Sequence, residues 1–426
     1  MKVLKSIKSL FNQEYFFSVF SKLLGVAIAI VYSVFYNRYL GALLKGEAAI
    51  ISNYISLISS FTAMGMYQAY PFYRKKDKEI FYPFVNNMTS LYFLMTLSCL
   101  VLIFVLPINT NLKVAVAIVP IQSYIRQINY VVMIEAPRRR NISSITINII
   151  DLLVILIFFL FSEATYGFLV GILLIQSTIN LVISYCNLKV DVKRLRFDLR
   201  QIPKYFKFGL LPMFTLLLMT LNYRIDIFML NDVFKVSVAE IGVYSVGISL
   251  AEKIWLVPDA IKDILMSRLS NGATEKEVAK VTRTSLFISL IMLAMMIVFG
   301  RPLILILYGN EFKQAYEILV IMMTGVIGMV FYKMVYAYNV VQGRRVVNLL
   351  FLGVAAITNI IGNYFLIPVG GVLAAAGVSV ISYIVCGFCF LIYFHRKTKI
   401  SYLDILFIKK KDFKTLTAFL KAKDKT

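Results

Sequence analysis

Apolar runs of about 19 to 24 residues recur along the whole chain and constrain its fold more than any other feature. A helix rises about 1.5 Å per residue, so each run is long enough to cross a hydrocarbon layer about 30 Å thick. The chain is 60% hydrophobic and 16% charged, with a mean hydropathy of +0.79, far outside the range of soluble globular proteins. The sequence therefore predicts an all-α polytopic membrane protein.

Twelve such runs predict twelve transmembrane helices in two six-helix bundles. The predicted helices are 15–36, 48–70, 84–106, 114–134, 144–162, 166–187, 208–230, 240–258, 285–308, 314–342, 348–368 and 371–394. The connections between them are too short for a nucleotide-binding or glycosyltransferase domain. The four cysteines and the single histidine, His395, match no disulfide framework and no zinc site. We therefore expect no enzymatic activity, no catalytic residues, no metal and no cofactor.

The basic residues fall on alternate loops. With the N-terminus inside, the cytoplasmic segments hold 34 of the 45 Lys and Arg residues, the outer loops hold five, and six lie inside apolar runs. Positively charged loops of membrane proteins face the cytoplasm. The pattern predicts a multi-pass membrane protein with both termini cytoplasmic. The basic residues behind the net charge of +23 then lie next to the anionic inner leaflet. Nucleic acid is therefore not an expected partner.

The longest connection divides the chain into two related halves. We expect an N-terminal six-helix lobe at 1–187, a cytoplasmic linker at 188–207, a C-terminal six-helix lobe at 208–394 and a basic cytoplasmic tail at 395–426. Gly46-Glu47-Ala48 in the first half has a counterpart in Ile241-Gly242-Val243-Tyr244, about 196 residues later. Parallel repeats of this kind place a substrate site at their interface, near the middle of the bilayer.

Within the tail, apolar residues recur at helical spacing among lysines. They are Phe413, Leu416, Phe419 and Leu420. The spacing favours an amphipathic helix lying on the cytoplasmic leaflet, and a solvated basic tail is the alternative.

Four local patterns follow one another along the chain: Arg38-Tyr39-Leu40-Gly41 with Lys45-Gly46-Glu47; Asp226 with Ile241-Gly242-Val243-Tyr244-Ser245; Leu307-Tyr308-Gly309 with Phe312 and Ala315; and Asn359-Ile360, Asn363, Leu366-Ile367-Pro368, Gly371 and Ala374-Ala375. In this order and at this spacing, they resemble the Wzx-type polysaccharide flippases of the bacterial inner membrane, members of the MOP superfamily, which also holds the MATE drug exporters. The resemblance spans nearly the whole chain. It implies a MATE-like fold of two six-helix bundles around a cavity that opens alternately to either side.

The resemblance also implies a cargo, an undecaprenyl-pyrophosphate-linked oligosaccharide such as an O-antigen or capsule repeat unit. Its partners would be this lipid, the surrounding membrane lipids, and the polysaccharide polymerase and chain-length machinery. A MATE-type ion-coupled multidrug exporter and a membrane-embedded polysaccharide polymerase are alternatives. A cationic drug calls for an acidic cavity, whereas the apolar runs hold six basic and about four acidic residues. Short loops disfavour the polymerase.

A pyrophosphate head group needs a hydrated, basic cavity, because polar groups without partners are costly in hydrocarbon. Five basic residues within the apolar runs are candidate substrate-binding cations: Lys253, Arg126, Lys333, Lys22 and Arg224. Lys253 lies about 13 residues into its predicted helix, roughly 19 Å from the outer end, where its ammonium group cannot easily reach the surface. The alternative for each cation is an ion pair of structural use.

Asp226 and Glu252 are candidates for proton or sodium coupling. Asn222 and Asp226 share a helical face at i, i+4, whereas Arg224 lies on a different face, so Asp226 need not be neutralised by Arg224. A buried carboxylate of this kind can exchange a proton or bind a cation. The alternative is that Asp226 and Glu252 form ion pairs that only stabilise the structure.

Overall fold

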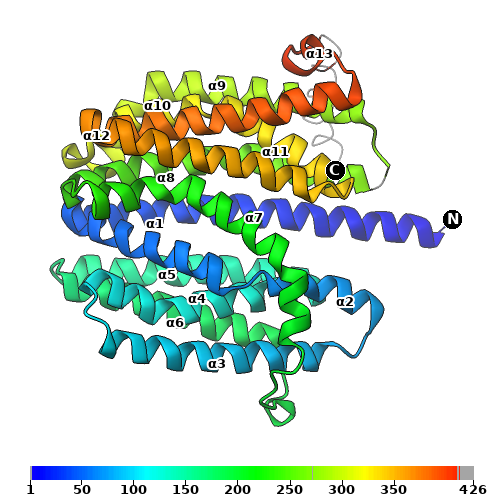
Figure 1. The fold of residues 1–426 in the computed structure, drawn as a ribbon, viewed down its shortest axis with the longest axis horizontal. Helices are drawn as coiled ribbons and strands as arrows, with labels where there is room; N and C mark the ends of the chain where they lie inside the picture. The colour runs from blue at the N-terminus through cyan, green and yellow to red at the C-terminus, as the bar shows by residue number, and fades with distance from the viewer. Residues whose placement is uncertain (1, 271, 410–411, 413–426) are drawn as a thin grey trace. The chain divides into compact units, whose positions relative to one another are not determined.

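The structure, a computed structural model, describes the backbone of residues 2–270, 272–409 and 412, with side chains from residue 24 onward. This part of the chain is almost entirely helical (Figure 1). The longer helices are α1 (Lys2–Thr62), α3 (Phe81–Val105), α4 (Thr110–Glu135), α5 (Pro137–Phe161), α6 (Tyr166–Leu188), α7 (Ile202–Phe228), α8 (Val238–Ser270), α9 (Glu275–Tyr308), α10 (Ala315–Thr324), α11 (Val326–Val341) and α12 (Arg345–Thr398). The shorter α-helices are α2 (Tyr70–Lys76) and α13 (Tyr402–Leu406). Three short 3-10 helices, η1 (Met66–Ala69), η2 (Val192–Arg194) and η4 (Asn310–Phe312), and one π-helical turn, η3 (Met229–Val233), complete the elements. The predicted tail helix lies outside the described residues.

Two pairs of predicted helices are each joined into one element that bends at a glycine. In α1 the break between the two apolar runs is at Gly41, with φ of 63°, and in α12 it is at Gly371, with φ of 53°. Glycine adopts a positive φ without steric cost, so one helix can end and the next begin within a single residue. The predicted helices 15–36 and 48–70 are therefore not separated by the loop at 37–47 that the sequence suggests, whereas 348–368 and 371–394 meet where they are predicted to meet.

Several helix ends differ from the predicted ones. α8 continues to Ser270 instead of 258, and α9 begins at Glu275 instead of 285, because polar residues extend both helices beyond their apolar runs. The predicted helix 314–342 is divided into α10 and α11, which are bent by 46°. Among the described residues, eight helices are long and apolar enough to span a membrane, and the bent pair would make a ninth span.

The chain forms two compact units. Unit 1 comprises Met1–Thr220 and Ser237–Gly242, and unit 2 comprises Leu221–Val236 and Val243–Thr426. Of the three boundaries between them, one lies inside α7, one in the connection just before α8 and one in the first turns of α8.

In unit 1, α4 and α5 pack against α1, and α6 packs against both of them (Figure 1). A buried aromatic cluster connects α2, α3 and the start of α7. The Phe84 ring lies 5.0 Å from that of Tyr70 and 4.9 Å from that of Tyr205. Rings at these separations contribute packing energy beyond the area they bury.

The backbone of α1 approaches the first residues of α8 very closely in unit 1. A Cβ atom on Gly46 would lie 1.9 Å from the carbonyl oxygen of Val238, and one on Gly242 would lie 2.0 Å from that of Ala42. No side chain fits at either distance. The two glycines that correspond in the sequence repeat are therefore both required by one helix contact.

The connection at 188–207 is held on α3, also within unit 1. Three polar side chains of α3 accept hydrogen bonds from backbone N–H groups of the connection. Arg196 N donates to Asn86 at 3.1 Å, Asp198 N to Ser90 at 2.8 Å and Gln201 N to Asn87 at 3.1 Å. Because all three acceptors are buried, the connection has a defined path over α3.

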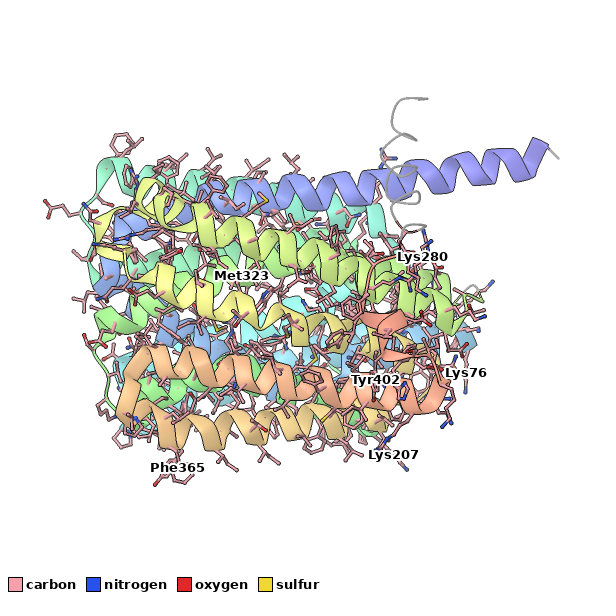
Figure 2. All side chains as sticks on the ribbon, turned by 90° about the horizontal axis from the view of Figure 1, so that it is seen from above. Lys76, Lys207, Lys280, Met323, Phe365 and Tyr402 are labelled. Carbon is pink, nitrogen blue, oxygen red and sulfur yellow. The ribbon has the colours of Figure 1, made fainter. Side chains whose placement is uncertain are left out.

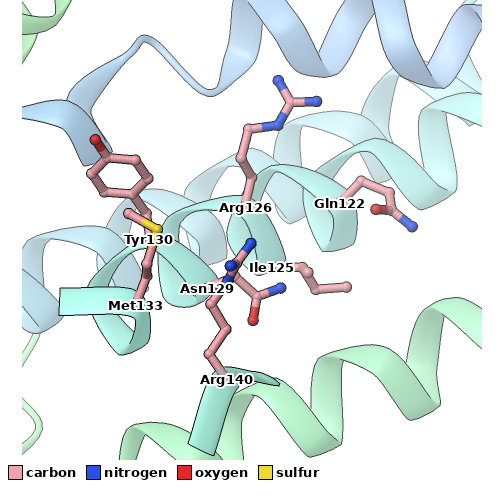
Figure 3. A pocket seen from close by; sticks show the side chains of 7 residues that line it. All are labelled: Gln122, Ile125, Arg126, Asn129, Tyr130, Met133 and Arg140. Carbon is pink, nitrogen blue, oxygen red and sulfur yellow. The ribbon is translucent and has the colours of Figure 1, made fainter. Parts of the chain in front are cut away.

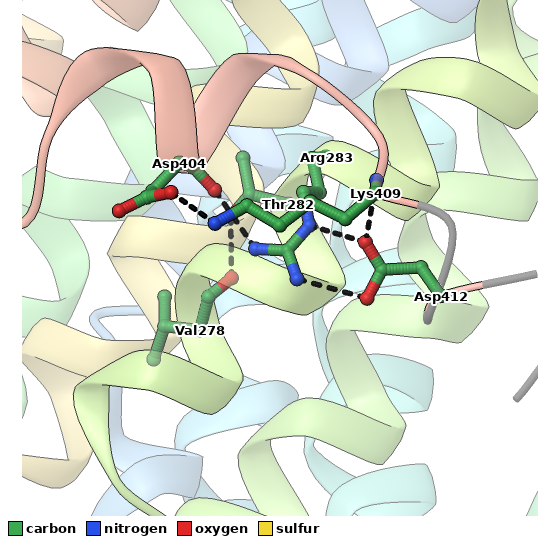
Figure 4. Close-up of polar contacts among 6 residues, drawn as sticks. All are labelled: Val278, Thr282, Arg283, Asp404, Lys409 and Asp412. Atoms are coloured by element: carbon green, nitrogen blue, oxygen red, sulfur yellow. Dashed lines mark hydrogen bonds and ion pairs between the residues drawn. The ribbon is translucent and has the colours of Figure 1, made fainter.

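In unit 2, α11 packs against α9 and α12, and α10 packs against the same two helices (Figure 1). The segment that follows α12 folds onto α9 through α13. There, Arg283 of α9 binds Asp404 and Asp412 (Figure 4). The C-terminal segment is thus anchored to the start of α9.

Basic residues gather at one end of the helices of each unit (Figure 2). In unit 1, Lys76 and Lys207 lie toward the same end. In unit 2, Lys280 and Tyr402 lie at one end and Phe365 lies at the opposite end. Within each unit, the lysines come from segments that the sequence predicts to share one side of the membrane.

Candidate functional site

A pocket of about 310 Å³ lies beside Arg126 in unit 1 (Figure 3). Its lining consists of the polar side chains Gln122, Arg126, Asn129, Tyr130 and Arg140, with Ile125 and Met133 as the apolar part. Two guanidinium groups and no carboxylate belong to this lining. The pocket therefore favours an anion.

The guanidinium of Arg126 is incompletely bonded. Its Nη2 lies 3.4 Å from Ser59 Oγ, a long hydrogen bond, and its Nη1 is buried without a partner. Arg126 is nine residues from the end of α4, roughly 14 Å along the helix axis. A buried N–H group of a charged side chain that lacks an acceptor costs about 1 to 3 kcal/mol or more. An anionic ligand would supply the missing acceptor.

Lys333, a candidate cation in unit 2, is already paired. It is buried on α11, and its Nζ lies 2.7 Å from Asp259 Oδ2 and 3.3 Å from the carbonyl oxygen of Trp255. Asp259 also accepts a hydrogen bond from Lys262 at 3.2 Å. The sequence did not indicate Asp259 as a partner, because the predicted helix ended at 258, one residue before it.

Arg224 and Glu252 form an ion pair between α7 and α8 in unit 2. Arg224 Nη2 lies 3.2 Å from each carboxylate oxygen of Glu252. Both side chains are about one-third exposed. The structure thus brings a candidate substrate cation together with a candidate coupling carboxylate.

Lys253 follows Glu252 on α8 and is half-buried. Its ammonium group forms no hydrogen bond and no ion pair within 4.0 Å to any residue that the structure describes. Lys22 lies within α1, where its side chain is outside the described residues. Of the four candidate cations whose side chains the structure describes, Arg126 and Lys253 therefore retain the most bonding capacity.

Asp226 is buried in a group of hydroxyl side chains in unit 2. Its carboxylate accepts hydrogen bonds from Tyr244 Oη at 2.5 Å, from the backbone N–H of Ile227 at 2.8 Å and from Ser379 Oγ at 3.5 Å. With 1% of its surface exposed, Asp226 has no access to bulk water. The arrangement suits a carboxyl that gains and loses a proton, or one that shares a small cation with neighbouring oxygens.

A network of amides and hydroxyls continues from this group along α7 and α12. Ser382 Oγ donates to Asn222 Oδ1 at 2.5 Å, and Asn359 Nδ2 donates to the Asn222 carbonyl at 2.9 Å. Asn363 Nδ2 in turn donates to Asn359 Oδ1.

Sequence reasoning assigned no ion-binding role to the α12 residues of this network. The available signal was the pair Asn359 and Asn363, two amides four residues apart in an apolar run. Within the described parts of the chain, no three His, Cys, Asp or Glu side chains gather as a metal site. A cation at Asp226 would therefore be bound mainly by neutral oxygens.

The fold is shared with transporters of known structure. The lipid II flippase MurJ in its inward closed conformation superposes with a TM-score of 0.71 at 14% identity, covering 92% of this chain and 89% of that chain. An inward-facing MATE family multidrug resistance transporter gives a TM-score of 0.61 at 13% identity, covering 88% and 94%. A MOP superfamily transporter from Pyrococcus furiosus gives 0.60 at 14% identity, covering 90% and 94%. The protein thus shares the helical fold of these membrane transporters.

The family of the chain follows from its sequence. The polysaccharide biosynthesis protein family matches residues 45–317, which is more than half of the 426 residues, and the chain belongs to this family. None of the curated proteins matches it. The predicted resemblance to a polysaccharide family with a MATE-like fold is confirmed by this match and by the shared fold.

Proposed function

We propose that the protein is a flippase that translocates an undecaprenyl-pyrophosphate-linked oligosaccharide, an O-antigen or capsule repeat unit, across the bacterial inner membrane by alternating access. The observation that carries this proposal is the guanidinium of Arg126, which has a buried, unpaired Nη1 beside a pocket lined by a second arginine and no carboxylate. A pyrophosphate supplies the acceptor oxygens that such a group lacks. Membership in the polysaccharide biosynthesis protein family supports a saccharide as the remainder of the cargo.

The membrane arrangement that we propose has twelve spans in two six-helix lobes, at 1–187 and 208–394, joined by the connection at 188–207. Nine spans follow from the eight long apolar helices and the bent pair α10–α11. α1 and α12 each contain two apolar runs that meet at a glycine, which adds two spans. α4, with 26 residues, supplies the last, although Arg126 and Pro120 lower its apolar character.

We propose the orientation that the positive-inside rule favours, with both termini and the basic tail at 395–426 in the cytoplasm. Thiol labelling of single-cysteine variants tests this orientation. Lys280→Cys should react with a membrane-impermeant reagent only from the cytoplasmic side, and Lys113→Cys only from the outside. The partners on this scheme are the lipid-linked oligosaccharide, membrane lipids, and the polymerase and chain-length proteins that consume the flipped unit.

Direction requires an energy source, and Asp226 is the proposed site of proton or sodium coupling. Its burial and its hydroxyl neighbours support this role. Glu252 is the second candidate, but its pairing with Arg224 leaves less of its carboxylate available to a mobile ion.

The flippase proposal is tested by reconstitution. Proteoliposomes with the wild-type chain should move a fluorescent undecaprenyl-pyrophosphate-linked oligosaccharide between leaflets. Arg126→Ala should slow this movement about 10- to 100-fold, which corresponds to the free energy of one hydrogen bond to a charged group. Arg138→Ala, which removes the same charge from outside the pocket, is the control. A wild-type protein that moves no lipid-linked oligosaccharide but exports a cationic drug would favour the multidrug-exporter alternative instead.

A further inference from the structure

A second arginine of the Arg126 pocket is also uncommitted. Arg140 lies in the first turn of α5, is exposed, and forms no side-chain hydrogen bond or ion pair with any described residue. The adjacent Arg139 is bonded through Nη1 to the carbonyl oxygen of Asn187 at 2.9 Å. Figure 3 shows the guanidinium of Arg140 directed toward Asn129, and that of Arg126 directed away from it. The pocket thus holds two guanidinium groups that face different parts of it.

The two arginines lie at different depths along the helices. Arg140 is at the α4–α5 junction, where the chain leaves the apolar run, whereas Arg126 is about 14 Å inward from the end of α4. The pocket therefore has a cation at its mouth and a second cation nearer to the middle of the bilayer. An anion that comes in from the junction meets Arg140 first.

The neutral side chains of the pocket suit a sugar. Asn129 Oδ1 accepts a hydrogen bond from Ser184 Oγ at 3.2 Å, and this contact leaves the amide N–H groups for a ligand. The Tyr130 ring lies edge-on to Tyr67, with ring centroids 4.9 Å apart, and is held in place by that contact. Amides bind sugar hydroxyls, and an aromatic ring packs against the apolar face of a sugar.

The size of the pocket limits what it holds. A volume of about 310 Å³ is at the lower end of the range of small-molecule sites, roughly 300 to 1,000 Å³. Such a volume accommodates a head-group fragment and excludes a whole oligosaccharide. Its charge selects an anionic fragment, and its two arginines favour a group with two phosphoryl units over a group with one.

We infer that the pocket of α4 and α5 is the subsite for the diphosphate and the sugar attached to it, and that Arg140 receives the diphosphate at the mouth before Arg126 binds it at depth. This inference rests on the proposed function. It assigns the recognition of the head group to unit 1, and it adds Arg140 and Asn129 to the residues that determine specificity.

Binding measurements on the purified full-length protein test the inference. The probes are undecaprenyl diphosphate, undecaprenyl monophosphate and phosphatidylglycerol, each titrated in nanodiscs of phosphatidylcholine and followed by native mass spectrometry. The wild type should prefer the diphosphate over both other lipids. Arg140→Ala and Arg126→Ala should each weaken diphosphate binding about 10- to 100-fold and reduce the preference over the monophosphate.

Three further variants sharpen the test. Arg138→Ala removes one charge from the same turn of α5 and should bind the diphosphate as the wild type does. Arg140→Lys keeps the charge without the planar fork and should be intermediate. Asn129→Leu should leave diphosphate binding nearly intact and weaken only binding of a diphosphate that carries a sugar. Arg140 is exposed at a helix end, so its variants are expected to fold, and thermal unfolding verifies this.

Several results would overturn the inference. Arg140→Ala could bind the diphosphate as tightly as Arg138→Ala does, or phosphatidylglycerol could compete equally, which would indicate a general site for lipid phosphates. Either result leaves the flippase proposal standing, since lipid-linked oligosaccharide would still be moved in proteoliposomes. A wild-type protein that neither binds undecaprenyl diphosphate nor moves the lipid-linked oligosaccharide would refute both.

Discussion

Arg283 binds both carboxylate oxygens of Asp412, at 2.6 and 2.8 Å, although the two residues are 129 positions apart (Figure 4). Both side chains are buried. Arg283 also donates to the carbonyl oxygen of Asp404 at 2.8 Å, and Asp412 accepts from the backbone N–H of Lys409 at 2.9 Å. This network connects the segment after α12 to the start of α9, and its hydrogen bonds satisfy the groups that burial removes from water.

Asp412→Ala should destabilise unit 2 by about 3 to 5 kcal/mol, because it leaves the charge of Arg283 buried without its partner. Thermal unfolding of the purified protein in detergent measures the change. Asp263→Ala is the control, since this carboxylate is half exposed and its pairing with Lys262 is a surface contact. Equal effects of the two substitutions would contradict the role of the buried pair.

The stability contributed by Asp412 should depend on pH. The hydrogen bonds from Arg283 lower the pKa of the Asp412 carboxyl below its usual value, by more than burial raises it. A carboxyl whose pKa is depressed in the folded state stabilises that state fully above the unfolded pKa, about 3.9, and loses the effect as pH falls through the folded pKa. The melting temperature of the wild type should therefore approach that of Asp412→Asn only below about pH 4. A constant difference down to the lowest accessible pH would be inconsistent with this linkage.

The ion pair of Lys333 and Asp259 should behave as a coupled unit. Lys333→Met and Asp259→Asn should each destabilise the protein, and the double substitution should be less harmful than the sum of the two, because no unpaired charge then remains buried. A coupling energy of about 0.5 to 3 kcal/mol is expected from thermal unfolding of all four proteins. Additive effects would contradict the pairing of Lys333 with Asp259 and leave Lys333 available as a substrate cation.

Asp226→Asn should preserve the fold and change the energetics of transport. Asparagine has nearly the same shape. Its carbonyl oxygen can accept from the N–H of Ile227 while its amide N–H donates to Tyr244 Oη, so the melting temperature should change little. Because the amide cannot take up a proton and binds cations weakly, flipping in proteoliposomes should no longer respond to an imposed proton or sodium gradient. Full dependence on the gradient in Asp226→Asn would rule out this residue as the coupling site.

Gly242→Ala and Gly46→Ala should each disrupt the contact of α1 with the start of α8. Because the added methyl group meets a backbone carbonyl about 2 Å away, the destabilisation should reach or exceed the 1 to 3 kcal/mol typical of overpacking. Gly377→Ala is the matched control, because nothing lies within 4 Å of a Cβ at that helical position. It should be neutral or slightly stabilising, as alanine favours helix. Equal melting temperatures for all three variants would contradict the close approach.

The sequence predicted the helical, membrane-spanning character well, because long apolar runs have few other stable arrangements. It placed helix ends poorly where polar residues extend a helix beyond the hydrocarbon, as at the C-terminal end of α8 and the start of α9. This error concealed Asp259, the partner of Lys333. It also gave a loop at 37–47 where the two helical parts of α1 meet at a single glycine, Gly41.

The family and the set of buried charges were determined by the sequence alone, since motif order and the presence of a charge in an apolar run are local properties of the chain. Which of these charges are neutralised was decided only by the tertiary structure. Lys333 and Arg224 have carboxylate partners on α8, whereas Arg126 has a buried Nη1 without a partner and lines a pocket with Arg140. The reason is physical: an ion pair depends on distances of 3 to 4 Å between side chains of different helices, and no spacing along one helix determines them.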